Sequence, residues 1–440
     1  MLKIACLCLA VAVTTPLGSQ VAPDATGGTL PPDEMMTPPP VSGDAYPVIV
    51  GAETRSNFLA GAIVVTGAYN DNLMADPTKK AGDWTYSIVP SISLDRRTPH
   101  HSESLSYNSG FTLYQNTPSL NGVTQEGSAG YQQHLSRFTV LSVKDTFRQN
   151  YNLFNQANPF VGTGISTGGS STNAVYVYPF ANQFGNSLDT GIEYQYSKSA
   201  MIGGGGSFSM LRYSNDKNTP GLDNSDMGQG SAFFSRRISP GQYLGINYEY
   251  AKISTHPVQT TTTTQTVFGF YTMYLTHTVS ISILGGPQHY YSRDDVSEAS
   301  SNSWTPAVQG SVGYQMPHTS FSVGFSHIVS SARGLVGAYH SDLAGFTARR
   351  QITRTWNLNA GVNYALFKNA TPNVSSMYPG GHTISGTASF ERSFRERLGL
   401  VIGYGRFHQT YNFGTNTSLY PDCNREFASV SYSLSRALGR

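Results

Sequence analysis

One pattern constrains this chain more than any other: apolar and polar residues alternate within segments of about ten residues, and such segments recur along most of its length. In the segment 84–96, for example, Trp84 and Tyr86 alternate with Thr85 and Ser87. Successive side chains of a β-strand point to opposite faces, so each segment would carry one apolar and one polar face. The sequence therefore predicts an all-β protein.

The number of these segments predicts about 18 strands, which we expect to close into a single antiparallel transmembrane β-barrel over residues 57–440. The strands are expected near residues 58–70, 83–96, 102–115, 122–135, 137–151, 184–198, 201–214, 228–238, 241–254, 262–277, 279–292, 304–316, 319–331, 340–353, 355–368, 381–394, 397–411 and 425–438. An even number of strands places both termini on one side, which is the periplasm in bacterial barrels.

Two features favour a membrane barrel over a soluble β-sandwich or propeller, which would show the same period. Aromatic residues of the apolar faces gather near strand ends, as membrane interfaces require. These are Tyr69, Trp84, Tyr86, Tyr194, Tyr196, Tyr248, Tyr250, Tyr314, Trp356, Tyr364 and Tyr404. Arginines gather beside the shorter of the alternating connections, at Arg96, Arg97, Arg137, Arg236, Arg237, Arg349, Arg350, Arg354, Arg392, Arg395 and Arg397. A soluble all-β fold stays as the alternative.

Composition agrees with strands in a membrane. Charged residues make up 12% of the chain, about half of what a soluble domain of typical composition carries. After the N-terminus no apolar run approaches the roughly 20 residues of a membrane-spanning helix. The formal net charge is only +2, and no basic stripe interleaved with aromatic residues occurs, so we expect no nucleic-acid partner.

The N-terminal 56 residues differ from the rest. Residues 1–20 combine a basic start, an apolar stretch and small residues, which is typical of a secretory signal peptide. Cys6 and Cys8 would be removed with it, leaving Cys423 without a partner for a disulfide. Residues 21–56 are rich in proline and lack periodicity, so we expect a disordered periplasmic linker.

Short motifs in the chain resemble those of outer-membrane β-barrel porin families that are encoded beside exopolysaccharide biosynthesis genes. The motifs are Tyr69-Asn70-Asp71-Asn72-Leu73, Ser93-Leu94-Asp95 and the segment 433–440, Ser-Leu-Ser-Arg-Ala-Leu-Gly-Arg. The resemblance extends from about Asn57 to the end, and it implies an outer-membrane barrel with a part in polysaccharide export. The chain departs from many such barrels by ending in Gly439-Arg440 rather than in an aromatic residue, which bears on recognition by the barrel-assembly machinery.

A barrel of this strand number leaves an aqueous lumen, so function would depend on what narrows it. The longest connection, near 152–183, contains no charged residue, and by similarity to porins its position as third long loop suggests that it folds inward. Its aromatic residues are the candidates for a channel constriction that stacks on a neutral solute such as a sugar: Phe154, Phe160, Tyr176, Tyr178 and Phe180. The alternative is that they pack the loop against the wall.

Acidic residues on the polar faces are the candidates for lumen charges that tune ion preference. They are Asp95, Asp189, Glu193, Glu249 and Glu391. The alternative is that they hydrate the wall or pair with arginines. Enzyme motifs carry less weight: Gly164-Ile165-Ser166-Thr167-Gly168 fits the nucleophile pattern G-x-S-x-G, but it lies in a Gly/Ser-rich loop instead of a strand-to-helix turn. We therefore expect no catalytic residue, no cofactor and no metal.

These expectations together predict an integral protein of a Gram-negative outer membrane, with periplasmic termini, that lets small hydrophilic solutes diffuse passively or with weak selectivity. The alternative hypotheses are a barrel component or accessory of exopolysaccharide export and an adhesin or structural barrel with a plugged lumen. Expected partners are membrane lipid and lipopolysaccharide, the barrel-assembly machinery and, on the resemblance, components of polysaccharide export.

Overall fold

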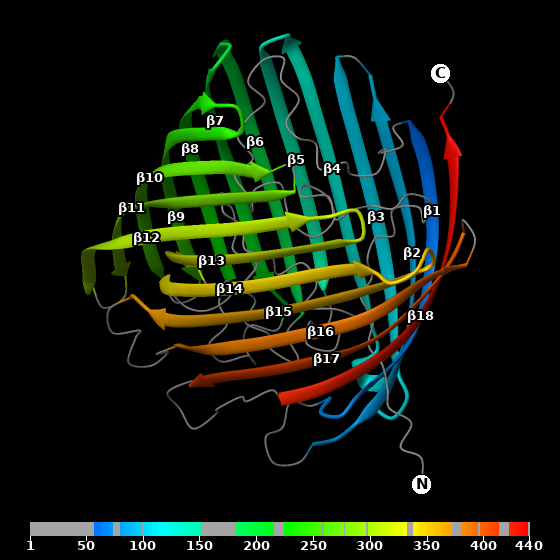
Figure 1. Ribbon diagram of the computed structural model, residues 1–440. Coiled ribbons are helices and arrows are strands. Elements are labelled where there is room, and N and C mark those ends of the chain that lie inside the picture. Colours follow the sequence, from blue (N-terminus) through cyan, green and yellow to red (C-terminus); the bar gives the residue numbers. More distant parts are fainter. Residues whose placement is uncertain are drawn as a thin grey trace.

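The computed structural model describes residues 57–73, 80–98, 100–150, 182–214, 224–256, 259–276, 278–295, 298–331, 338–371, 380–394, 397–412 and 422–438. Eighteen strands run through these ranges (Figure 1): β1 (Phe58–Asn70), β2 (Asp83–Arg97), β3 (His101–Tyr114), β4 (Gly122–Ser136), β5 (Thr139–Asn150), β6 (Gln183–Ser197), β7 (Ala200–Tyr213), β8 (Asn224–Ser239), β9 (Gln242–His256), β10 (Thr260–Thr276), β11 (Val279–Asp294), β12 (Ser300–Gln315), β13 (Thr319–Ser331), β14 (Ala338–Gln351), β15 (Trp356–Asn369), β16 (Gly380–Phe394), β17 (Leu398–Asn412) and β18 (Asp422–Ala437). One 3-10 turn, η1 (Pro118–Leu120), follows β3. Within these ranges no helix is both long and apolar enough to cross a membrane.

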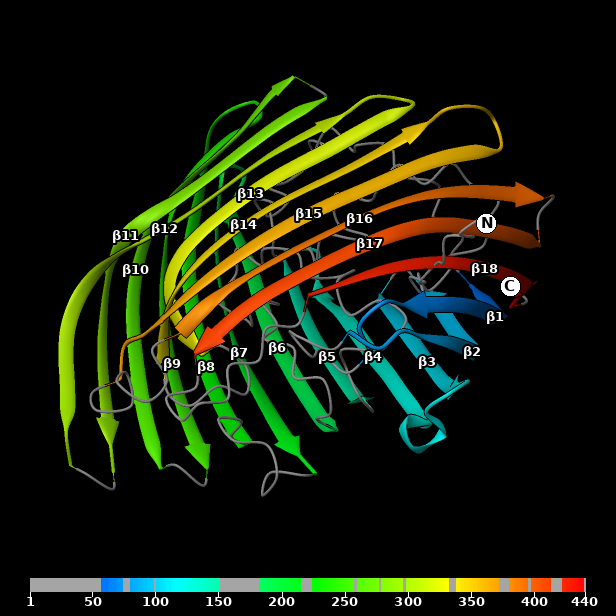
Figure 2. The same cartoon turned by 90° about the horizontal axis from the view of Figure 1, so that it is seen from below.

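Each strand pairs antiparallel with the strands before and after it, and β1 also pairs with β18, so the sheet closes on itself. The predicted all-β, 18-stranded closed barrel is thereby confirmed. Figures 1 and 2 show β10 to β17 as one curved wall facing the wall of β3 to β7. The largest differences from the expected strands are at β8 and β12, which begin at Asn224 and Ser300 and not near residues 228 and 304. Their weakly alternating first residues pair with neighbouring strands, those of β8 with β7 and β9 and those of β12 with β11.

The two ends of the barrel differ in their connections. At the end where β1 begins and β18 ends, successive strands join through tight turns, with Ser136 paired to Thr139 and Ser239 paired to Gln242. We call this the short-turn end and the opposite one the long-connection end. Both ends of the barrel sequence, at Phe58 and Ala437, lie side by side at the short-turn end.

Side chains alternate between the outer and inner faces of the wall as the sequence predicts. On β9, the outward Leu244, Ile246 and Tyr248 are exposed, whereas the inward Asn247 and Glu249, which alternate with them, are buried. The same alternation holds on β2, where Tyr86 and Ile88 point outward and Thr85 and Ser87 point inward. Large apolar side chains therefore cover the outside of the cylinder, the reverse of a water-soluble protein.

Inward-facing aromatic rings lie flat on the wall because glycines stand opposite them. Phe270 of β10 is in register with Gly245 of β9, and Phe427 of β18 is in register with Gly403 of β17. A Cβ atom at either glycine would overlap the phenylalanine ring and a backbone carbonyl oxygen. The missing side chain thus makes room for the ring beside the strand, so that the ring does not project across the lumen.

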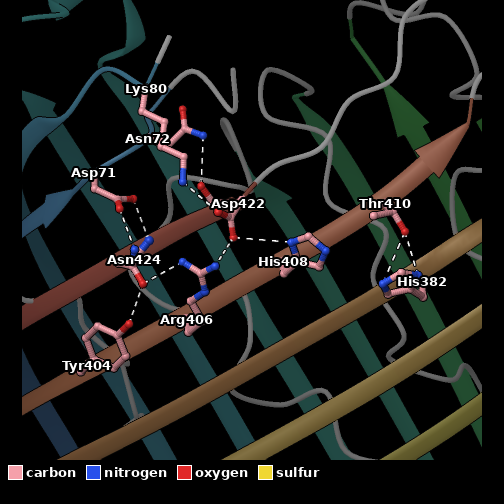
Figure 3. A network of polar contacts seen from close by, with 10 residues as sticks. All are labelled: Asp71, Asn72, Lys80, His382, Tyr404, Arg406, His408, Thr410, Asp422 and Asn424. Carbon is pink, nitrogen blue, oxygen red and sulfur yellow. Dashed lines mark hydrogen bonds and ion pairs between the residues drawn. The ribbon is translucent and has the colours of Figure 1, made fainter. Parts of the chain in front are cut away.

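A polar network, which we call the clasp, holds β1 to β18 at the long-connection end (Figure 3). Asp71, just after β1, accepts hydrogen bonds from the backbone N–H and the Nδ2 of Asn424, both at 2.7 Å. The Oδ1 of Asn424 also accepts from the Tyr404 hydroxyl at 2.6 Å and from Arg406 Nη1 at 2.9 Å. These contacts tie the first strand to the last two beyond the final register pair.

Asp422 forms the second half of the clasp. Its carboxylate pairs with Arg406 Nη2 at 2.5 Å and with Lys80 Nζ at 2.8 Å, and His408 Nδ1 lies 3.5 Å away. Asn72 donates its Nδ2 hydrogen to the Asp422 backbone carbonyl at 3.1 Å. The connection between β1 and β2 is therefore fastened to β18 by both side-chain and backbone groups.

Substitution of Gly245 by alanine should destabilise the barrel by about 1–3 kcal/mol, because the added Cβ must displace the Phe270 ring or the backbone. Gly67→Ala is the matched control, since no heavy atom lies within 4 Å of its would-be Cβ. The temperature at which the detergent-folded protein loses its compact gel mobility measures the difference. Equal transition temperatures for the two variants would contradict the account of the ring and glycine pairs.

Substitution of Asp71 by alanine should also lower the transition temperature. We expect the free energy of unfolding to fall by about 1–3 kcal/mol, because the partly buried N–H and amide of Asn424 lose their acceptor. Asp295→Ala is the control, since it removes only exposed contacts, an ion pair with Arg293 and a hydrogen bond from Thr261 Oγ1, whose contribution should be at most about 1 kcal/mol. An Asp71 variant as stable as the Asp295 variant would show that the clasp does not stabilise closure.

Candidate functional site

The inner wall of the barrel is a surface of small hydroxyl-bearing side chains. Hydroxyl groups of neighbouring strands meet in pairs across it: Ser106 with Ser128 at 2.7 Å, Thr272 with Ser282 at 2.9 Å and Ser322 with Thr347 at 2.7 Å. Each hydroxyl can both donate and accept, so the half-buried pairs keep hydrogen-bonding capacity for the lumen, whereas the pair of Thr272 and Ser282 is fully buried. These hydroxyl pairs make parts of the lining polar without adding charge.

The wall has a packed half and an open half. On the packed half, Phe268, Phe270, Leu284 and Ala307 form a cluster that is almost fully buried, with Ile328 against it. On β4 and β6, by contrast, the inward side chains are half-buried or exposed along the strands. Space for a solute among the described residues is therefore greater beside β4 to β6 than beside β10 to β13.

An irregularity in strand pairing explains part of the packed half. Strand β12 pairs with β13 only from Val308 to Gln315, so the last residues of β13 have no β12 neighbour in the ladder. Gln288 of β11 takes that place: its Oε1 accepts from the Val329 N–H at 2.7 Å and its Nε2 donates to the Val329 carbonyl at 3.2 Å. Its side-chain amide thus substitutes for a backbone peptide.

The same gap in the pairing of β12 with β13 brings the long-connection ends of β11 and β15 together. Ser292 Oγ donates to Thr371 Oγ1 at 3.1 Å, and Thr371 Oγ1 accepts from the Ala338 N–H at 3.0 Å. Tyr290, Val329 and Ala338 form a small buried cluster beside these contacts. Polar and apolar contacts therefore fix β11 over the ends of three later strands.

All five acidic residues proposed as lumen charges occupy inward positions, but the structure does not gather them into one site. Asp189 and Glu193 share β6, on the open half. Glu249 is buried on the packed half and accepts a hydrogen bond from Asn247 Nδ2 at 2.6 Å. Glu391 accepts from Asn359 Nδ2 at 3.5 Å, and Asp95 lies near the short-turn end of β2.

Sequence reasoning missed a set of charged residues on the open half. Glu126 of β4 and Arg148 of β5 form an ion pair across the two strands, with Arg148 Nε 3.2 Å from Glu126 Oε1. Lys144 faces inward on the same strand and is in register with Asp189 of β6. The signal that could have identified them is spacing, since Lys144 and Arg148 are four residues apart and so share a strand face. Positive and negative groups therefore alternate along this part of the wall.

Other predicted features lie outside the described residues. The constriction candidates Phe154, Phe160, Tyr176, Tyr178 and Phe180 belong to this group, as does the Gly164 to Gly168 motif. Among the residues that the structure does describe, no three His, Cys, Asp or Glu side chains are placed to hold a metal ion.

No protein-family model matches this chain, and no curated protein matches its sequence. Among solved structures, the chain is similar to the ferric citrate transporter FecA in its unliganded form, with 8% identity, a TM-score of 0.47 and coverage of 86% of this chain and 79% of that one. It is also similar to the outer membrane protein OpdK of Pseudomonas aeruginosa, with 10% identity, a TM-score of 0.43 and coverage of 86% and 99%. For OccAB4 of Acinetobacter baumannii the values are 11%, 0.42, 87% and 99%. Nothing about solute or partner follows from a likeness at these scores.

Proposed function

We propose that this protein is an outer-membrane channel through which small hydrophilic solutes diffuse passively or with weak selectivity. The observation that carries the proposal is the closed 18-stranded cylinder with an apolar outer face and a hydroxyl-lined inner face. Hydrocarbon offers no hydrogen bonds, so a backbone that crosses it must satisfy its own polar groups, and a closed sheet does so without a free edge. A polar lumen follows from the same alternation of side chains.

The dimensions of the apolar face support placement in a membrane. On β1 the outward residues from Leu59 to Tyr69 are apolar or glycine, and the next outward residue is Asp71. At about 3.3 Å per residue and a tilt of about 40°, this stretch spans about 25 Å across the sheet, the height of the apolar band in outer-membrane barrels. The outward Tyr404 of β17, hydrogen-bonded to the clasp, would lie at the upper edge of that band.

The orientation we propose has the short-turn end in the periplasm, because outer-membrane barrels keep their short turns there. Both termini would then be periplasmic, and the segment before the barrel would be a periplasmic linker after removal of a signal peptide. Membrane lipid, lipopolysaccharide and the barrel-assembly machinery are the partners that this placement implies. The connection near 152–183 stays our candidate constriction.

The inner wall argues for weak selectivity toward uncharged solutes. Its hydroxyl pairs can exchange hydrogen bonds with a sugar or a small polar metabolite, and Glu126 and Arg148 partly neutralise each other. No contact among the described residues favours the alternative part in exopolysaccharide export, so we do not propose it as a second function.

The purified protein in planar bilayers should give stepwise conductance, and liposomes that contain it should swell in isotonic solutions of small neutral sugars. Swelling should slow as the sugar becomes larger, since the packed half leaves only part of the cross-section open. A heat-denatured sample is the control. Absence of both conductance and swelling across detergents and voltages would reject the proposal.

Reversal of the charge at Lys144 should change ion preference if this residue faces the conducting path. Lys144→Glu adds negative charge on the open half, so the cation-to-anion permeability ratio should rise a few-fold at about 0.1 M salt and less at higher salt. Lys252→Glu is the matched control, because Lys252 points outward from β9. Reversal potentials in a salt gradient give the ratio, and identical ratios in the two variants would place the path elsewhere.

A further inference from the structure

Arg392 lies close to two aromatic rings on the outer face of the barrel. Its guanidinium carbon lies 5.2 Å from the centroid of the Trp356 ring and 4.5 Å from that of the Phe394 ring. Trp356 begins β15 and is in register with Arg392 of β16, and Phe394 is the next outward residue of β16. Both rings are close enough for cation–π contact with the guanidinium, which favours this position of the side chain.

This arrangement lies at the short-turn end, at the edge of the apolar band. The outward residues toward the middle of the barrel are Leu358 on β15, Phe390 on β16 and Ile402 on β17. On the outward faces of β15, β16 and β17, the described residues include no Asp or Glu. Arg392 therefore has no acidic partner on its own strand or on the two strands that flank it.

A donor of Arg392 is also left without a hydrogen bond. Its Nε is buried and has no hydrogen-bond partner among the described residues. A buried charged donor without an acceptor is costly, and because protein atoms cover Nε, an anion can offset that cost only by binding the terminal amino groups of the half-buried guanidinium.

We propose that Trp356, Arg392 and Phe394 form a binding site for the phosphate group of a membrane phospholipid. The terminal N–H groups of a guanidinium form a fork, and paired phosphate oxygens match that fork. The inference rests on the proposed placement in a membrane, in which this end meets the phospholipid headgroups. The acyl chains would then lie along Leu358, Phe390 and Ile402, which a free phosphate ion could not use.

The geometry favours a lipid over a soluble anion because the site opens sideways. An anion that passes through the lumen would meet the inward residues of β15 and β16, such as Asn359 and Glu391, on the other side of the wall. Tryptophan is enriched at membrane interfaces, where the apolar part of its ring faces hydrocarbon and its N–H faces water. The outward position of the site and the chemistry of its residues therefore both favour a phospholipid.

The test uses native mass spectrometry of the full protein released from nanodiscs that contain phosphatidylglycerol. The wild type should retain a bound phosphatidylglycerol, and Arg392→Gln should weaken its retention at least tenfold, with Arg392→Lys in between because lysine cannot pair in a bidentate manner. Arg236→Gln is the matched control, since Arg236 is an exposed outward arginine at the same end of β8. Inorganic phosphate added at millimolar concentration should not displace the lipid.

Equal retention by the wild type and the Arg392→Gln variant would overturn the proposal, as would complete displacement by inorganic phosphate. Trp356→Leu provides a second variant that leaves the charge in place and should weaken retention less than Arg392→Gln, so loss of folding in one variant still leaves a decisive comparison. The readout does not depend on conductance. A protein that conducts but binds no lipid at Arg392 would refute this site alone, whereas failure to enter nanodiscs would refute the membrane placement itself.

Discussion

The closed hydrogen-bond ladder is the constraint on which the rest of this structure depends. A sheet whose outer face is apolar cannot leave backbone donors and acceptors free at an edge, so β1 must meet β18. The clasp extends that junction beyond the last register pair, through Asp71 and Asn424. The last residues of β13 have no backbone partner on β12, and there the side-chain amide of Gln288 supplies the donor and acceptor that a strand would have supplied. Satisfaction of backbone groups thus accounts for both the regular and the irregular parts of the wall.

The strand period allowed most of the fold to be predicted, because a period of two depends only on local geometry. Tyr86 and Thr85 are assigned to opposite faces by their positions alone, and the structure places them so. Contacts between residues far apart in the sequence could not be predicted from this period, because they do not depend on local geometry alone. Nothing in the local pattern of Gln288 indicates that it bonds to Val329 across an intervening strand, because such a contact depends on how far the sheet curves. The ion pair of Glu126 and Arg148 needed the register of β4 and β5, which alternation does not fix.

Inward glycine and phenylalanine residues occur as pairs on neighbouring strands, where the glycine makes room for the ring. An inward phenylalanine would narrow the lumen, and an inward glycine would leave the ladder without side-chain packing. Paired across strands, as Phe270 with Gly245, the ring covers the glycine and buries itself against the wall. The barrel therefore keeps buried apolar area on its inner face while much of that face stays polar.

The two faces of the wall impose opposite conditions on arginine. An inward arginine can pair with an inward acid, as Arg148 does with Glu126. An outward arginine at the edge of the apolar band can do so only where a neighbouring strand provides an outward acid, as β3 provides Glu103 near Arg96. On β16 no neighbouring strand does so, and two aromatic rings stack on Arg392 in place of a carboxylate. The rings stabilise the cation but accept no conventional hydrogen bond, so the unfilled acceptor position is a direct consequence of strand order and outward-face composition.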